Sequence, residues 1–539
     1  MAAIPPGSFV TPRAERLLFW TLLMLASVAG GLMVATTLTT GIGWDSGIDT
    51  LAAAQIRDLD PGVGLRDAYA TVYSTSEFYG VLVQNLAEWI SRGLGAAQGL
   101  PTNTLETYRW QGMVTVTLIL LASSTAGWAV AKVTRSRVAG AFAVAVTLSI
   151  PLVMGLSAVD FKDAPVAAGL LIVSSGLALA SIDSLSRRRS LLAATLVAVG
   201  SFITLGVRIG AWPLVAALVA GSVVVVAGRA AFTRQGRTVA VITASSGVGF
   251  LLALVALYFL NPFARLDYIR WAYDAYATAR DFPWSGTVRT LGLDLDAAAL
   301  PWWYAPVWFL AQVPVLVTLS ALAGIVAWMV LVIRAGWREP RSPIAALAPF
   351  FIQGLALPVA VIGSGAILYD GIRHLLFAVA AVGPMSASLV VWLEHRSSTT
   401  SRAWIRWSPW LVVIVPVAAL VADVRWFPYQ YAHINAVAQQ VDGDRPWELD
   451  YWGVTVLEAE RLLREEGVEA VAVLPEIAPQ GTAEVLDIRG LAAIPADVGM
   501  FGAFSFRRGD AQLPDGCEAA FTIERAGELL GEAVVCDRR

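Results

Sequence analysis

Residues 138–182 read VAGAFAVAVTLSIPLVMGLSAVDFKDAPVAAGLLIVSSGLALASI. Two apolar runs, 138–157 and 165–182, flank one short charged segment, Asp160-Phe-Lys162-Asp163. Each run approaches the length of about 20 largely apolar residues that a helix needs to cross the hydrocarbon core of a bilayer. The stretch therefore predicts two membrane helices joined by a charged turn.

The composition of the whole chain supports this interpretation. Of its 539 residues, 57% are hydrophobic and 15% are charged, and the mean hydropathy is +0.65. Soluble globular proteins contain roughly 45–50% apolar and about 25% charged residues, and disordered chains are poorer still in apolar residues. The net charge of −3 argues against nucleic acid as a partner. With only three histidines in all, His374, His395 and His433, a multi-histidine metal site is not expected.

We predict an all-α polytopic membrane protein with about eleven transmembrane helices. They are expected near 17–40, 111–131, 138–157, 165–182, 190–207, 211–228, 239–260, 312–333, 344–366, 374–393 and 408–424. Arg and Lys are concentrated before the first helix and in the short loops after every second helix, and such loops are typically cytoplasmic. The predicted location is the cytoplasmic membrane, with a cytoplasmic N-terminus. No cleavage site follows the first apolar stretch, so a retained helix is expected.

The opposite, outer side carries most of the remaining chain. We expect a transmembrane module over 1–436, with long outer loops at 41–110 and 261–311, and a small extracytoplasmic α/β domain over 437–539. The segment 454–466 has the periodicity of an amphipathic helix, 468–475 that of a strand, and 516–536 that of a strand pair. An extracytoplasmic position favours a disulfide between Cys517 and Cys536 over two free thiols.

Two carboxylates follow the first predicted membrane helix. Asp45 and Asp49 are four residues apart and would share one face of a helix. Carboxylates at this position can act as a general base, bind a cation or cap the following helix. The spacing alone leaves these three alternatives open.

The segment Asp160-Phe-Lys162-Asp163 is more specific, because Lys162 is one of only two lysines. In a chain that otherwise uses Arg, this suggests a need for a compact ammonium group. The alternative is that Lys162 only neutralises its neighbours. Asp160 or Asp163 would position Lys162 or bind a divalent cation such as Mg²⁺ or Mn²⁺.

Arg208, Arg373 and His374 lie on the predicted outer side, against the positive-inside trend. An anionic ligand would explain this asymmetry, because the Arg guanidinium recognises phosphate in a bidentate manner. The alternatives are arginines that snorkel to the interface and a histidine that only packs. No nucleotide-binding loop is present, so use of ATP is not expected.

These landmarks, taken in order, resemble the polytopic glycosyltransferases of the C superfamily (the GT-C fold). The most similar groups are glycosyltransferase family 39 and the dolichyl-phosphate-mannose-dependent protein mannosyltransferases. The resemblance rests on Asp45 and Asp49, on Phe161-Lys-Asp-Ala-Pro165, and on later motifs that span much of the chain. The later motifs are Pro301-Trp-Trp-Tyr-Ala-Pro306, Tyr369-Asp-Gly-Ile-Arg-His374, Phe427-Pro-Tyr-Gln-Tyr-Ala-His-Ile-Asn435 and Asp450-Tyr-Trp-Gly453.

The resemblance implies transfer of a sugar from a polyprenyl-phosphate carrier to an acceptor hydroxyl on the outer face of the membrane. It also implies a general base at Asp45 or Asp49, and a donor pocket lined by Lys162 and Asp163 and by Arg373 and His374. On charge alone, Arg208 is expected to join Lys162 and Arg373 in binding the donor phosphate, and direct attack on one face would invert the sugar. The expected partners are the lipid-linked donor, membrane lipids and an acceptor that is a protein, a glycolipid or a polysaccharide. A non-catalytic relative and a transporter or flippase of lipid-linked sugars remain the alternatives.

Overall fold

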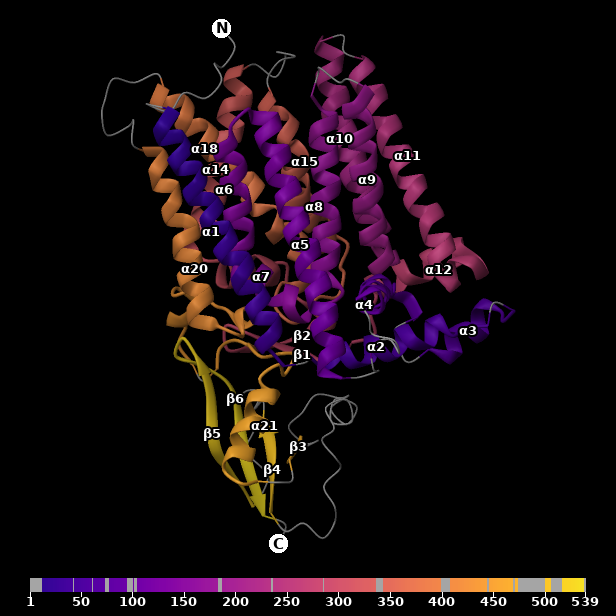
Figure 1. Cartoon of the computed structure of the whole chain (residues 1–539), viewed down its shortest axis with the longest axis vertical. Coiled ribbons are helices and arrows are strands. Elements are labelled where there is room, and N and C mark those ends of the chain that lie inside the picture. Colours follow the sequence, from indigo (N-terminus) through magenta and orange to yellow (C-terminus); the bar gives the residue numbers. More distant parts are fainter. Residues whose placement is uncertain are drawn as a thin grey trace.

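The computed structural model describes two connected parts, a bundle of long helices and a small sheet domain at one end of it (Figure 1). The residues described are 12–41, 43–60, 62–72, 77–94, 100, 104–182, 187–233, 236–284, 286–335, 343–398, 408–443, 445–468, 471–473, 500–505 and 516–537. We call the end of the bundle next to the sheet the C-domain end.

Within these residues, nine helical segments are long and apolar enough to cross a membrane, or ten if one bent pair counts as a span. Six of the nine are single helices: α1 (Pro12–Thr39), α5 (Leu105–Thr134), α8 (Asp163–Ala180), α9 (Arg187–Val207), α11 (Gly236–Leu260) and α14 (Val315–Ala335). A seventh joins a 3₁₀ turn (Ile209–Ala211) to α10 (Trp212–Thr233). The other two combine a 3₁₀ segment (Pro343–Leu347), α15 (Ala348–Phe351), a π-helical turn and α16 (Leu357–Gly363), and η6 (Arg373–Leu375), α17 (Leu376–Ala380) and α18 (Val382–Ser398). The predicted helical polytopic fold is confirmed.

Two of the eleven predicted helices differ in the structure. The expected helix at 138–157 is broken into α6 (Arg137–Leu148) and α7 (Pro151–Val159), which meet at 59°. Pro151 causes the break, because it has no N–H to continue the hydrogen bonding of α6 and is tolerated only in the first turn of α7. The expected helix at 408–424 is a 3₁₀ segment, Ser408–Val413, followed by α20 (Ile414–Trp426) of only 13 residues.

Helix α8 lies in the interior of the bundle, and every one of its residues is buried. It contacts α5, α9, α10 and α17, so it is surrounded by protein and not by lipid. Its N-terminus, at Asp163, therefore opens into the interior of the C-domain end. The charged turn that the sequence singled out is held in this protected position.

The two long connecting segments contain short elements at the C-domain end (Figure 1). Residues 41–110 include α2 (Trp44–Arg57), α3 (Leu65–Thr71) and α4 (Leu82–Gly93) before α5 begins. Residues 261–311 include α12 (Pro262–Arg280), the hairpin of β1 (Thr287–Thr290) and β2 (Leu293–Asp296), and most of α13 (Tyr304–Gln312). Of these elements, α2 reaches the turn that precedes α8, because Asp45 and Asp49 lie within ion-pair distance of Lys162.

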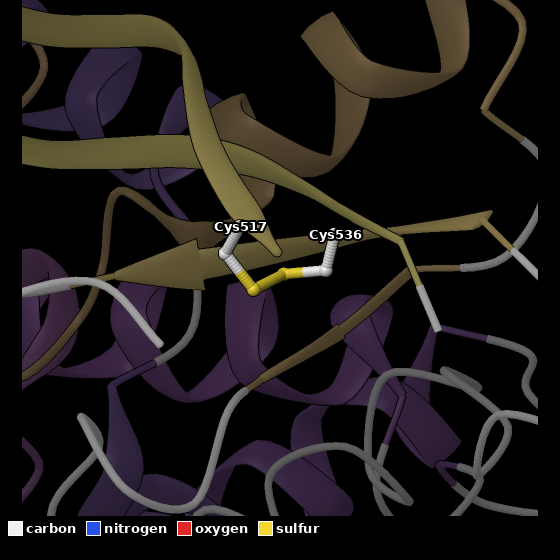
Figure 2. Close-up of a disulfide and its surroundings, with 2 residues drawn as sticks. All are labelled: Cys517 and Cys536. Carbon is white, nitrogen blue, oxygen red and sulfur yellow. A yellow bond between two sulfur atoms is a disulfide. The ribbon is translucent and has the colours of Figure 1, made fainter. Parts of the chain in front are cut away.

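The C-terminal part contains α21 (Val456–Glu465) and a four-stranded sheet with the order β3-β4-β6-β5. The strands are β3 (Val471–Val473), β4 (Met500–Ser505), β5 (Cys517–Arg525) and β6 (Glu528–Asp537). β3 pairs with β4 in parallel, and the other pairs are antiparallel. Cys517 and Cys536 face each other across β5 and β6 and form the predicted disulfide (Figure 2). The predicted helix and strand pair are confirmed, and part of the predicted strand at 468–475 lies outside the described residues.

Candidate active site

The turn between α7 and α8 is organised by the side chain of Asp160. Its Oδ1 accepts hydrogen bonds from the backbone N–H groups of Lys162 and Asp163, both at 2.8 Å. These bonds satisfy two donors at the start of α8, as an N-terminal cap does. Asp160 therefore holds the turn in a shape that directs the next two charged side chains into the interior.

Lys162 reaches across to helix α2. Its Nζ lies 3.1 Å from Oδ2 of Asp45 and 3.2 Å from Oδ2 of Asp49. The two carboxylates share one face of α2, as the four-residue spacing predicts. Their accessibility differs, because the Asp45 side chain is 35% exposed and the Asp49 side chain is 7% exposed. One ammonium thus joins a reachable carboxylate to a buried one.

Asp163 holds two arginines from distant parts of the chain. Its Oδ1 lies 3.0 Å from a terminal nitrogen of Arg208, and its Oδ2 lies 3.0 Å from a terminal nitrogen of Arg373. Arg373 also forms an ion pair with Asp370 at 3.1 Å. Bonds of this type are stronger than neutral hydrogen bonds and fix the planes of both guanidinium groups.

Arg373 is additionally enclosed by two aromatic rings. Its guanidinium lies 4.7 Å from the ring centroid of Tyr369 and 5.0 Å from that of Trp452, and its side chain is 1% exposed. Trp452 precedes α21 and also packs on the chain just before α2, where a Cβ added to Gly43 would lie 3.3 Å from its ring. The start of the C-terminal part thus contacts both Arg373 and the segment that leads to Asp45.

Tyr79 joins the two groups of charges. Its ring centroid lies 4.8 Å from Nζ of Lys162 and 5.2 Å from the guanidinium carbon of Arg208, within the range of cation–π attraction. The next residue, Gly80, donates a backbone hydrogen bond to Val207 at 2.7 Å. A Cβ at Gly80 would lie 1.8 Å from the carbonyl oxygen of Gly206, so only glycine permits this approach.

Burial and neighbouring charges shift the pKa values of the ionisable groups outside the membrane helices. Burial raises the pKa of Asp49 to about 6, against the opposing effect of Lys162. Burial also acts on Asp45, but Lys162 and Arg373 outweigh it and lower the pKa of Asp45 below its usual range. Burial and the charge of Asp163 raise the pKa of Asp160 to about 8. At neutral pH, Asp45 is therefore the carboxylate that is most firmly ionised among these three.

A cavity of about 340 Å³ opens beside these charges. Its polar end is lined by Tyr79, Asp163, Arg208, Tyr369 and His374. Among the described residues, Nε of Arg208 and Nδ1 of His374 are buried and have no hydrogen-bond partner. The rest of the wall is mainly apolar and comes from α8, α10, α12, α16 and α17: Val166, Pro213, Leu214, Ala217, Ala275, Leu357, Ala360, Val361 and Phe377.

The structure brings all eight site residues expected from the sequence to the C-domain end. Asp45, Asp49 and Lys162 form one ion-paired group, and Asp163, Arg208 and Arg373 form another. Asp160 supports the turn between them, and His374 lines the cavity. Tyr79 and Trp452 were not predicted as site residues. Trp452 belongs to the motif Asp450-Tyr-Trp-Gly453, whereas no local pattern distinguishes Tyr79 from the other 12 tyrosines.

The candidate divalent cation does not fit the arrangement of the carboxylates. Asp163 is directed to two arginines, and Asp45 and Asp49 to Lys162. Oδ1 of Asp160 is directed to the backbone, which leaves its buried Oδ2 as a single oxygen without a partner. Across the described part of the chain, no group of three or more His, Cys, Asp or Glu side chains is arranged to hold a metal ion. Asp45, Asp49 and Asp163 are instead paired with cationic side chains.

No family model and no curated protein matches the sequence. Among solved structures, the chain is similar to the archaeal oligosaccharyltransferase AglB from Archaeoglobus fulgidus, determined in complex with an inhibitory peptide and a dolichol-phosphate. The identity is 10% and the TM-score is 0.47, over 90% of this chain and 61% of the other. This chain thus spans about three fifths of the length of that protein, and no residue role is carried over from it.

Proposed function

We propose that this chain is a membrane glycosyltransferase that moves a sugar from a polyprenyl-phosphate-linked donor to an acceptor hydroxyl. The observation that carries the proposal is the cavity with two different ends. Its polar end is lined by Arg208 and His374, each of which has a buried side-chain nitrogen without a hydrogen-bond partner among the described residues, and its walls between α8, α10, α12 and α16 are mainly apolar. A lipid that ends in a phosphate has the same division between a charged head and a hydrocarbon tail.

The polar end is suited to a phosphate group. Among the described residues Arg208 forms an ion pair with Asp163 alone, and its buried Nε has no hydrogen-bond partner, so a small shift of the side chain would let it donate to an anion. Gly210 and Ala211, which line the cavity, immediately precede α10, so the positive end of that helix dipole also faces this region. The tail of the donor would occupy the apolar part of the cavity, where each buried methylene contributes about 0.8 kcal/mol.

Lys162 and Arg373 have a different role in this proposal from Arg208. Both are held by carboxylates, and Arg373 is almost completely buried. They would act on the leaving phosphate through their field and through the positions of Asp45 and Asp163. Preorganised charges of this kind stabilise developing charge without reorganising during the reaction.

Asp45 is the proposed general base. It is the more exposed of the two carboxylates on α2, and its pKa lies below the usual range, so it is ionised at neutral pH. The acceptor oxygen would form a bond to the anomeric carbon while the bond from that carbon to the phosphate oxygen breaks. The proton of the acceptor would pass to Asp45, and the electron pair would leave with the phosphate. A single displacement of this kind inverts the sugar.

The membrane orientation is part of the same proposal. The basic segments at the other end of the bundle would face the cytoplasm, and the C-domain end would face outward. A sugar already linked to a lipid phosphate is activated, so transfer there would not require ATP. Bacterial cell-envelope substrates are the expected setting, with a protein, glycolipid or polysaccharide as acceptor.

The test is transfer by membrane vesicles supplied with radiolabelled polyprenyl-phosphate sugars and extracted envelope acceptors. Asp45→Asn is expected to lower the rate by about 10²–10⁴-fold, the range for loss of a general base. Arg208→Gln is expected to raise the KM for the donor. Asp294→Asn, an exposed carboxylate on β2, is the matched control and should transfer at the wild-type rate. Equal transfer by Asp45→Asn would refute the assignment, and lipid movement across the vesicle without transfer would favour a flippase.

A further inference from the structure

The ammonium of Lys162 lies where a metal ion would have to lie in order to use the carboxylates of α2. Its Nζ is 3.1 Å from Oδ2 of Asp45 and 3.2 Å from Oδ2 of Asp49. Both carboxylates come from one face of a helix and converge on this single point. Carboxylate oxygens arranged in this way are the ligands that Mg²⁺ and Mn²⁺ prefer.

Lys162 is fixed in this position from several sides. Its backbone N–H is held by Asp160 at 2.8 Å, its ammonium lies over the ring of Tyr79, and its side chain is only 10% exposed. Lys162 immediately precedes α8, which is buried throughout, so its backbone is fixed at the end of a helix enclosed by protein. A divalent ion entering between Asp45 and Asp49 would meet this positive charge within about 4 Å, where like charges repel strongly.

We propose that the ammonium of Lys162 is a built-in replacement for a divalent cation, so that transfer proceeds without metal. The claim about transfer rests on the proposed function, whereas the claim that Lys162 occupies the place of a cation between Asp45 and Asp49 does not. The ammonium holds Asp45 in place and supplies positive charge next to the leaving phosphate. A bound divalent cation would have the same two effects there. Removing the ammonium leaves two converging carboxylates and creates a site for Mg²⁺ or Mn²⁺.

The experiment measures Mn²⁺ binding by electron paramagnetic resonance on the purified full-length protein, with no substrate present. Wild type is expected to bind no Mn²⁺ at this site. Lys162→Ala is expected to bind one Mn²⁺ per chain, with a dissociation constant of about 10⁻⁴–10⁻³ M, as in weak carboxylate sites. The matched control is Lys132→Ala, because Lys132 is the other lysine of the chain and lies near the far end of α5.

Further variants locate the bound ion. Adding Asp45→Asn to Lys162→Ala should weaken Mn²⁺ binding by about 10–100-fold. Lys162→Met keeps the length of the side chain without its charge, and it replaces Lys162→Ala if that variant does not fold. The inference is overturned if wild type binds Mn²⁺ and loses it in Asp45→Asn, or if neither folded Lys162 variant gains a site.

The activity arm separates this inference from the proposed function. Wild-type transfer should be unchanged by EDTA, and the low activity of Lys162→Ala should rise when Mn²⁺ is added. Wild-type transfer that EDTA abolishes and Mn²⁺ restores would overturn the inference while supporting the glycosyltransferase assignment. Absence of transfer under every condition would instead refute the proposed function, and the Mn²⁺ titration would still decide the structural claim.

Discussion

Asp163→Asn tests whether the arrangement of the site depends on one buried carboxylate. Asp163 binds Arg208 and Arg373 at 3.0 Å each and is almost completely buried. The amide keeps one acceptor oxygen, but its NH₂ group would face a guanidinium that can only donate. Arg373 retains Asp370, whereas Arg208 loses its ion-pair partner among the described residues. The loss is therefore concentrated at Arg208.

The magnitude follows from these contacts. Each hydrogen bond to a charged group contributes about 1.5–3 kcal/mol, and removing one partner of a buried ion pair costs about 3–5 kcal/mol. Since half of the acceptors remain and Arg373 keeps a second carboxylate, we expect the free energy of unfolding to fall by about 3 kcal/mol. A displaced Arg208 should also raise the KM for the donor by about tenfold or more, because 1.4 kcal/mol of binding is worth that factor.

The assay is a double-mutant cycle with Asp163→Asn and Arg208→Gln. Unfolding is followed in detergent micelles by tryptophan fluorescence, and the KM for the donor is measured on the same preparations. We expect a coupling energy of about 1.5–3 kcal/mol between the two positions, and a smaller one between Asp163 and an exposed arginine such as Arg461. A coupling below about 0.5 kcal/mol in folded proteins would refute the reasoning, since distant sites vary by that amount.

Three further predictions concern single features of the structure. Burial raises the pKa of Asp49 to about 6. As the pH falls through this value, protonation of Asp49 should weaken its ion pair with Lys162 and lower the transfer rate. Asp49→Asn should remove that step from the pH profile. Gly80→Ala should lower activity and stability together, because the added methyl meets a backbone carbonyl and displaces the neighbouring aromatic ring; a variant with wild-type KM and thermal stability would contradict this. Reduction of the Cys517–Cys536 disulfide should destabilise the C-terminal sheet by about 3 kcal/mol, measured as faster proteolysis of that domain, while the helical bundle stays resistant.

The local features of the site were predictable from the sequence because each rests on a short-range rule. The spacing of Asp45 and Asp49 fixes a shared helical face, and both side chains do bind the same ammonium. The lengths of the apolar runs predict most of the membrane helices. They do not predict the break at Pro151, which divides one run into two helices. The disulfide followed from the expected extracytoplasmic position of the tail. In each case the predicted feature itself lies within one element or one hairpin.

The partners of the charged residues were less predictable. Sequence proximity suggested that Lys162 pairs with Asp160 and Asp163, but Asp160 caps the backbone and Asp163 binds arginines. The partners of Lys162 instead lie more than 100 residues earlier in the chain. At a helix N-terminus, successive side chains point in different directions, so neighbours in the sequence need not be partners in space. Contacts such as those of Tyr79 depend wholly on the tertiary fold.

The balance of charge in the assembled site bears on how it can bind an anion. Lys162, Arg208 and Arg373 are paired with Asp45, Asp49, Asp163 and Asp370, so the three cations are outnumbered and each is held by at least one carboxylate. Bulk positive charge therefore does not explain recognition of a phosphate. What remains for an anion is directional: the unpartnered Nε–H of Arg208 and the imidazole of His374 at the polar end of the cavity, near the start of α10. A site of this kind favours a ligand with one phosphate in one orientation, and charge-conserving Arg208→Lys, which removes the Nε–H donor and the planar fork, should impair donor binding nearly as much as Arg208→Gln.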